Sequence, residues 1–314
     1  MVSRKGPPVP RVRFTALCQT LAAFVLAAAA WVVLSAGQAA PARPPRLEIS
    51  HAARALVPGE AVLLTLTATS GSLTSARGHA FGQPFTAYAG TSGGAWHALI
   101  GIDLTARPGP ATVEVEARLA DGSPLHGKLP LKVGPKTFAT RRLTVAPEFV
   151  TPPPAEQERI ERERLLLNRV LSALSPRHLW GDGFFRPVDG EVISVFGVRS
   201  VFNGEARAPH RGVDFRGATG TPVGAPARGV VVLAEPLYFS GSTVILDHGL
   251  GVFSMLAHLS RIDVKPGALV VGGDVVGAIG ATGRVTGPHL HWTLRIGAAA
   301  VDPMSVLAVA GVDR

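Results

Sequence analysis

Glycine and proline recur along most of this chain and restrict it to short elements of secondary structure. The 314 residues include 36 glycines and 26 prolines, and only 6% of the residues are aromatic. Because both residues interrupt helices and start turns, this composition favours many short strands over long helices. The length indicates two domains rather than one. A hydrophobic fraction of 46% is sufficient for a sizeable core.

The first 40 residues have the layout of an export signal. Residues 1–13 are basic, residues 14–34 are almost entirely apolar, and small residues follow. This order is typical of a secretory signal, for which we expect cleavage near Ala39 or Ala40. The apolar segment also has the length of about 20 residues that a membrane-spanning helix needs, so an uncleaved inner-membrane anchor through residues 14–34 is the alternative.

The charge and the cysteine content exclude several classes of protein. The formal net charge is +9, and without the four basic residues in 1–13 it falls to +5. This mild basicity serves solubility or affinity for an anionic polymer such as a cell wall. No basic run is interleaved with aromatic residues, so we expect no nucleic-acid partner. The only cysteine, Cys18, lies in the apolar segment, which excludes a disulfide framework and a thiolate metal site.

Residues 46–146 predict a domain of short strands. Apolar runs at 61–66, 99–104 and 112–117 are separated by turn-forming Pro-Gly and Asp-Gly pairs. The last run alternates polar and apolar residues, as a strand with one buried face does. This pattern over about 100 residues indicates a β-sandwich of immunoglobulin-like architecture. The histidines of this region are expected to be structural or exposed: His51, His79, His97 and His126.

A helical connector is predicted at residues 151–180. The stretch from Ala155 to Ala173 is rich in Glu, Arg and Leu and lacks Gly and Pro, and Pro176 follows it. Prolines at both ends of such a stretch bracket a helix. Residues 185–314 then return to apolar runs and glycine turns without a convincing helical period. We therefore expect a second all-β domain there and a chain that is mainly β.

Residues 209–214 of this second domain carry side chains suited to metal binding. They read Pro-His-Arg-Gly-Val-Asp, and the central glycine argues against a helix. On an extended chain residues i, i+2 and i+4 point the same way, so His210 and Asp214 face one side while Gly212 leaves room between them. Imidazole nitrogen and carboxylate oxygen are natural zinc ligands.

Two further segments place histidines at strand positions. Gly-Pro-His-Leu-His puts His289 and His291 on one strand face, with the intervening leucine on the other. His258 follows an apolar run at residues 252–256. Each segment alone is also compatible with packing, and their combination in one domain points to a metal site. The other two histidines of the region lack such a setting: His178 and His248, the latter interpreted as part of an Asp-His-Gly turn.

Together these segments resemble the lysostaphin/LytM-type zinc endopeptidases of bacterial cell walls. The match extends from about Phe196 to Pro303 and takes in several motifs in order: Phe196-Gly197-Val198-Arg199, His210-x-Gly212-x-Asp214, Gly224-Ala225-Pro226-Ala227-x-Gly229-Val230-Val231, His258-Leu259-Ser260, Gly280-x-Thr282-Gly283 and Gly287-Pro288-His289-x-His291. The resemblance implies an antiparallel β-sheet fold with one Zn²⁺ in a groove. It also implies hydrolysis of peptide bonds in peptidoglycan crosslinks or stem peptides. The N-terminal strands and the connector look like the accessory region of longer Gram-negative relatives.

The resemblance assigns roles to five residues of this chain. Three match the zinc ligands of the family: His210, Asp214 and His291. His258 and His289 match its two catalytic histidines that do not bind the metal. One position departs from the family, because Leu256 stands where a tyrosine is frequent, and we expect this change to alter the wall of the groove.

A site with three protein ligands leaves a fourth zinc position for water, as catalytic zinc sites do. The metal lowers the pKa of that water and polarises the scissile carbonyl. The chain has no His-Glu-x-x-His segment that would supply a glutamate base. His258 and His289 are therefore the candidates for the base and for the group that stabilises the oxyanion and protonates the leaving amine, and the residues do not decide between them.

Three other functions compete with the peptidase. The first is a catalytically silent family member that binds peptidoglycan or activates another hydrolase. The second is a structural zinc protein, against which the missing fourth Cys or His ligand argues. The third is a secreted peptidase that acts on proteins. We expect an extracytoplasmic protein of the periplasm or cell envelope with peptidoglycan as its partner, and the residues indicate no protein partner.

Overall fold

The structure is a computed structural model, and it describes residues 43–91, 93–144 and 152–311. The predicted export segment at residues 1–40 lies outside the described residues. No helix within the described ranges is long and apolar enough to cross a membrane. Residues 45–314 form one compact unit, and strands dominate it, so the expectation of a mainly β chain is confirmed.

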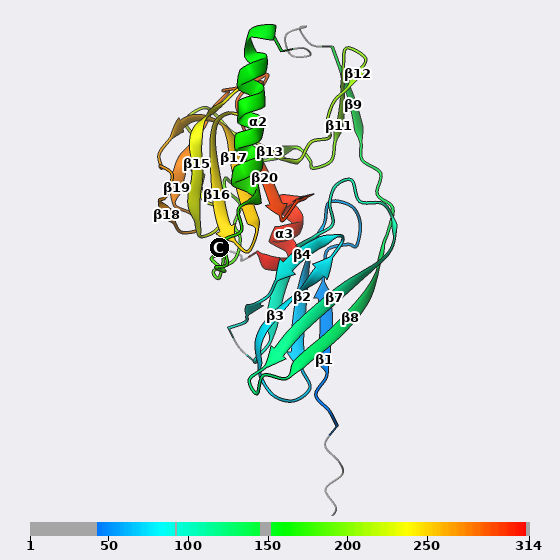
Figure 1. Cartoon of the computed structure of the whole chain (residues 1–314). Coiled ribbons are helices and arrows are strands. Elements are labelled where there is room, and N and C mark those ends of the chain that lie inside the picture. The colour runs from blue at the N-terminus through cyan, green and yellow to red at the C-terminus, as the bar shows by residue number, and fades with distance from the viewer. Residues whose placement is uncertain (1–42, 92, 145–151, 312–314) are drawn as a thin grey trace, which may run out of the picture. The chain divides into compact units, whose positions relative to one another are not determined.

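Two four-stranded antiparallel sheets form from residues 47–133 (Figure 1). The first has the order β1-β2-β6-β5: β1 (Leu47–Ala52), β2 (Ala61–Ala68), β5 (Tyr88–Ala89) and β6 (Trp96–Gly101). The second has the order β4-β3-β7-β8: β3 (Leu73–Ala80), β4 (Gln83–Thr86), β7 (Gly109–Leu119) and β8 (Pro124–Val133). Inward-facing side chains of both sheets share one hydrophobic cluster. The run expected at 99–104 is displaced, because β6 ends at Gly101 and residues 102–104 follow the strand.

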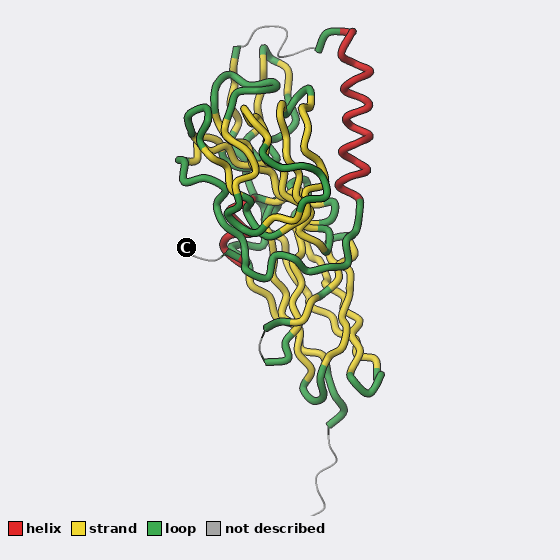
Figure 2. Tube along the Cα trace, turned by 90° about the vertical axis from the view of Figure 1, so that its left-hand side faces the viewer, coloured by secondary structure: helices red, strands yellow, loops and turns green. Residues whose placement is uncertain are grey.

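The predicted connector helix is present as α2 (Gln157–Ser172), after the short 3₁₀ turn η2 (Pro154–Glu156). Figure 2 shows this helix running alongside strands. Its first half carries exposed Glu–Arg pairs. Leucines and a valine of its second half pack on one face of the C-terminal sheet.

Residues 192–301 build a ten-stranded antiparallel sheet. Its main order is β10-β13-β20-β17-β16-β15-β18, with β14, β19 and β21 attached at its sides. The bounds are β10 (Val192–Ser194), β13 (Gly212–Arg216), β14 (Pro222–Gly224), β15 (Gly229–Leu237), β16 (Gly241–Gly249), β17 (Val252–Ile262), β18 (Leu269–Val270), β19 (Val275–Ile279), β20 (His289–Ile296) and β21 (Ala299–Val301).

A small third sheet and one helix complete the described residues. The sheet has the order β12-β11-β9: β9 (Thr140–Leu143), β11 (Arg199–Phe202) and β12 (Glu205–Ala206). The expectation of an all-β domain after residue 185 is wrong at its end, where α3 (Pro303–Ala310) forms. Asp302 caps this helix by accepting a hydrogen bond from the backbone N–H of Met304, and Pro303 occupies its first turn.

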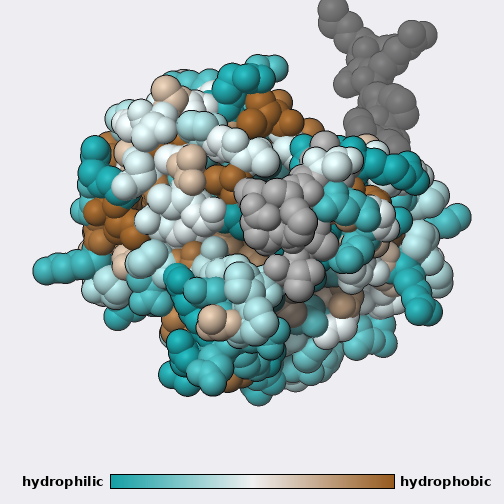
Figure 3. Space-filling model, turned by 90° about the horizontal axis from the view of Figure 1, so that it is seen from above, coloured by the Kyte–Doolittle hydropathy of each residue, from teal (hydrophilic) through white to brown (hydrophobic). Residues whose placement is uncertain are grey.

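Strand β20 has one apolar and one polar face, and this division positions the polar residues of the sheet. The apolar face is fully buried: Leu290, Trp292 and Leu294. Strand alternation places the remaining side chains on the opposite face: His289, His291, Thr293 and Arg295. Hydrophobic residues are otherwise dispersed over the surface that Figure 3 shows, in separate patches among hydrophilic ones.

Candidate metal centre

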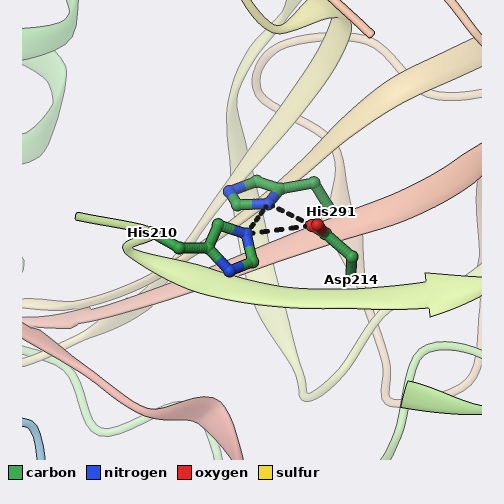
Figure 4. Close-up of side chains that lie close together, drawn as sticks. All are labelled: His210, Asp214 and His291. Carbon is green, nitrogen blue, oxygen red and sulfur yellow. Dashed lines mark hydrogen bonds and ion pairs between the residues drawn. The ribbon is translucent and has the colours of Figure 1, made fainter. Parts of the chain in front are cut away.

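Three of the sequence-predicted side chains meet at the polar face of the sheet (Figure 4). Asp214 in β13 lies opposite His291 in β20, and its Oδ1 is 2.7 Å from His291 Nδ1. His210 precedes β13 and brings its Nε2 to 3.0 Å from the same carboxylate oxygen. The two imidazole nitrogens are themselves 3.0 Å apart. One atom from each residue therefore points to a single centre.

The outward-facing nitrogen of each imidazole is held by a hydrogen bond. His210 Nδ1 lies 3.0 Å from the carbonyl oxygen of Val195, which can only accept, so Nδ1 carries the proton and Nε2 keeps its lone pair. His291 Nε2 lies 2.9 Å from Thr293 Oγ1. When Nε2–H donates there, Nδ1 is likewise an acceptor. Two nitrogen lone pairs and a carboxylate oxygen at these distances repel one another unless a cation lies between them, so the donor set fits a metal ion.

Gly212 allows β13 and β20 to approach closely enough for this meeting. A Cβ at this position would lie 2.4 Å from the carbonyl oxygen of Trp292 and 2.7 Å from His291 Cε1. Any larger side chain would displace the backbone of β20 or the ring of His291. The glycine therefore provides the room that its place between His210 and Asp214 predicted.

The protonation of the centre follows from burial and the shared carboxylate. Burial raises the pKa of Asp214. Without a metal ion, the inward-facing nitrogens of His210 and His291 donate to the carboxylate when they carry a proton, and these hydrogen bonds outweigh burial and hold the pKa of Asp214 well below its usual range. Burial lowers the pKa of His291 and outweighs the hydrogen bond that the ring donates to Asp214, which acts in the opposite direction. Burial also lowers the pKa of His210, but the hydrogen bond to Asp214 and the charge of that carboxylate outweigh burial, so the pKa of His210 is raised. The centre thus holds one permanent negative charge.

The other two predicted residues, His258 and His289, lie beside this centre. Their ring centroids are 4.9 Å apart, and that of His258 is 5.8 Å from His291. His289 Nε2 is 3.9 Å from Asp214 Oδ1. Each Nδ1 lies 2.9 Å from a backbone carbonyl oxygen, that of residue 282 for His258 and of residue 287 for His289. Because a carbonyl only accepts, Nε2 of both rings keeps its lone pair.

A β-bulge turns His258 toward the centre. Leu256 pairs with Val244 and Leu259 pairs with Ser242, so β17 holds one more residue than β16 between these pairs. His258 itself has φ +64°. In a regular strand His258 would share the buried face of Leu256, and the extra residue moves it to the opposite face. The predicted effect of Leu256 on the groove wall is wrong, because this side chain is fully buried in the core.

The remaining two histidines of the region lie outside the centre. His178 stacks on Tyr88, with ring centroids 3.6 Å apart. His248 is fully buried and belongs to β16, so its interpretation as a turn residue is wrong. Sequence reasoning also missed Thr293 and Arg295, which share the face of His291. The alternation of β20 beyond His291 was the signal that could have found them.

The chain resembles known proteins in sequence and in structure. Residues 208–303 match the model of peptidase family M23. DD-carboxypeptidase/endopeptidase Mpg of Neisseria meningitidis is 43% identical over 97 residues, which cover 31% of this chain and 22% of Mpg. Peptidoglycan DD-endopeptidase ShyA of Vibrio cholerae is 43% identical over 97 residues, which cover 31% of this chain and 23% of ShyA. The matches thus span less than a quarter of the length of these relatives.

One solved structure is similar over most of the fold. It is a candidate peptidase M23 from Pseudomonas aeruginosa, with a TM-score of 0.62 and 34% sequence identity. The similarity covers 82% of this chain and 96% of that protein. It therefore includes much more than the segment that carries the histidine motifs, and the chain belongs to peptidase family M23.

Proposed function

We propose that this protein is a zinc metalloendopeptidase that hydrolyses peptide bonds of peptidoglycan crosslinks or stem peptides. One observation carries the proposal. Three acceptor atoms, from His210, Asp214 and His291, converge within 3.0 Å, and two further histidines turn free Nε2 atoms toward the same place. A structural zinc site does not need the second pair, whereas a hydrolase needs groups that move protons.

In this mechanism His210 Nε2, Asp214 Oδ1 and His291 Nδ1 would hold one Zn²⁺. When bound, the metal supplies Lewis acidity and an activated water. His258 and His289 do the proton chemistry through Nε2, one by accepting the proton of the nucleophile and the other by stabilising the oxyanion and protonating the leaving amine. The carbonyl groups of residues 282 and 287 keep the Nδ1 protons in place and so fix both rings in the required tautomer.

The substrate assignment draws on the relatives. ShyA is named a peptidoglycan DD-endopeptidase and Mpg a DD-carboxypeptidase/endopeptidase. Together with the basic net charge, these names support an anionic cell-wall polymer as the substrate. The peptide termini released from sacculi identify the bond that is cut.

The rest of the chain is assigned to delivery and support. We propose that residues 1–40 export the protein to the periplasm or cell envelope, as a cleaved signal or as a membrane anchor through residues 14–34. We further propose that residues 46–146 are an accessory domain of immunoglobulin-like architecture and that residues 151–180 connect it to the peptidase domain at 185–314. The two sheets that share one core support the assignment of residues 46–146 as an accessory domain.

The alternative is a catalytically silent protein that binds peptidoglycan or activates another hydrolase. Incubation of the purified protein, without residues 1–40, with peptidoglycan sacculi separates the two. We expect new peptide termini to be released, and a chelator to abolish the release until Zn²⁺ is restored. Tight binding to sacculi without new termini, in protein that contains zinc, would instead establish the silent alternative.

A further inference from the structure

A cavity of about 690 Å³ adjoins the metal centre. His291 and Thr293 line it on the side of the centre, and α2 contributes Leu167 and Leu171 to its wall. Three arginines also line it: Arg164, Arg211 and Arg295. A cavity with apolar walls and a few cationic groups is suited to a ligand that combines a carbon skeleton with a negative charge.

The position of Arg295 follows from the strand that carries the metal centre. His291, Thr293 and Arg295 alternate along the polar face of β20. At a rise of about 3.4 Å per residue, Arg295 lies about 13 Å along the strand from His291. An extended peptide that passes the metal centre would reach Arg295 within about four residues. The arginine is therefore placed to contact the chain that is being cleaved.

The cavity has more positive than negative charge. In the described part of the chain, Arg211 and Arg295 form no ion pair with an acidic group. Asp103 is the acidic residue among the lining side chains. Its Oδ1 accepts a hydrogen bond from the backbone N–H of Thr105 at 2.8 Å, and its Oδ2 accepts one from that of Ala300 at 2.9 Å. The local structure thus already uses the carboxylate.

Arg295 is partly desolvated, and one of its buried donors has no acceptor among the described residues. Its Nη2 donates a hydrogen bond to the carbonyl oxygen of Ala298 at 3.2 Å. Its Nε is buried and has no hydrogen-bond partner among the described residues. Burial lowers the pKa of Arg295, the neighbouring charge of Arg211 acts in the same direction, and the charge of Asp103 opposes them without reversing the decrease. A buried N–H of a guanidinium without an acceptor is costly, and a carboxylate is the acceptor that fits its geometry.

We propose that Arg211 and Arg295 form a subsite that binds a free carboxylate of the substrate peptide close to the scissile bond. The inference rests on the proposed peptidase function and adds the chemistry by which the peptide is chosen. A peptide carboxylate is favoured as the ligand because the cavity is continuous with the face of His291. The apolar wall from α2 and Met255 covers the carbon atoms of the same peptide.

The test compares one crosslinked muropeptide with free carboxylates and the same compound with its carboxylates amidated. The full chain without residues 1–40 carries Arg295→Gln or Arg211→Gln, with Arg261→Gln as the matched control. Arg261 is exposed, pairs with Asp263 and does not line the cavity. For the free acid we expect each cavity variant to raise KM about tenfold with little change in kcat, the effect of losing one charge-assisted hydrogen bond.

The amidated compound supplies the decisive comparison. For the amidated compound, we expect wild type to show a KM as high as that of the glutamine variants for the free acid. We expect Arg295→Gln to have the same KM for both compounds. Arg295→Lys should recover part of the preference because it restores the charge. An equal preference for the free acid in wild type and in both glutamine variants would overturn the subsite.

Failure of the proposed function is recognised separately. In that case wild type would cleave neither compound in a chelator-sensitive way. Calorimetric binding of the two compounds to the zinc-loaded protein then still tests the subsite. We expect about tenfold tighter binding of the free acid by wild type and equal binding by Arg295→Gln, and equal binding by wild type would overturn the proposal. Thermal unfolding of each variant verifies that it is folded.

Discussion

His248 and His258 are two buried histidines on neighbouring strands, and their nitrogens have different partners. In His248, Nδ1 lies 2.9 Å from the carbonyl oxygen of Arg228 and Nε2 lies 2.9 Å from Ser254 Oγ. In His258, Nδ1 has a carbonyl partner, no partner is recorded for Nε2 among the described residues, and the ring lies beside those of His289 and His291. Burial is the first cause that lowers the pKa of each ring, to about 4 in both cases. The pKa alone therefore does not separate a packing histidine from one placed for catalysis, whereas the hydrogen bonds do.

The backbone conformations of His248 and His258 also differ. Both residues lie at register shifts between β16 and β17, but the backbone at His258 has a positive φ of +64°, whereas His248 is not among the described non-glycine residues with positive φ. Such conformations cost of order 1–3 kcal/mol and persist where the surrounding structure imposes them. The histidine with the strained φ is thus the one beside the candidate metal centre, and the histidine without it is packed in the interior.

The largest expected effects come from two histidines within the site. His291→Ala removes a proposed metal ligand, so we expect loss of bound zinc and of all measurable turnover. His289→Ala removes no ligand, so we expect zinc near one ion per chain and a turnover reduced about 10²–10⁴-fold. Elemental analysis of the purified variants and release of peptide termini measure the two quantities. Equal zinc content together with equal activity in both variants would refute the division of roles.

The second prediction exchanges the two buried histidines for asparagine. His258→Asn should keep zinc and stability, because asparagine tolerates positive φ, while turnover falls about 10²–10⁴-fold. His248→Asn should keep most of the turnover but lose about 2–3 kcal/mol of unfolding free energy, because Ser254 Oγ and the carbonyl oxygen of Arg228 both lose their hydrogen bond to the imidazole. Turnover and urea denaturation of both variants measure these effects. Similar stability losses with unchanged turnover in both would show that His258 is only a packing residue.

Much of the site could be predicted from the sequence because strand alternation is local. His289 and His291 were expected on one strand face, and β20 places them there. The close approach at Gly212 also followed from its place in the motif. These features need only a strand period of two and the absence of a side chain.

Other features depend on residues far apart in the sequence. The direction of His258 depends on a bulge against β16, which its own segment does not encode, and the same bulge made the expectation for Leu256 wrong. Helix α3 was missed because its apolar residues, interrupted by Ser305, have no amphipathic period. An apolar segment buried on several sides loses the pattern that identifies a helix. The setting of Arg295 required the tertiary neighbours that line its cavity.

The third prediction tests the buried histidine through pH. The pKa of His248 is about 4 in the folded chain, against about 6.5 in an unfolded chain. Between these values the unfolded state binds a proton that the folded state excludes, so stability falls as the pH drops from 6.5 to 4. A difference of this size corresponds to roughly 3 kcal/mol, all of it present above pH 6.5.

His248→Asn lacks this titrating group, and the other histidines of the chain titrate equally in both proteins. Urea denaturation at several pH values should therefore show a stability difference between wild type and His248→Asn that is largest near pH 7 and shrinks toward pH 4. Both proteins are measured with chelator, so that acid release of a metal ion does not contribute. A difference that stays constant over this range would mean that His248 is not kept neutral by its surroundings.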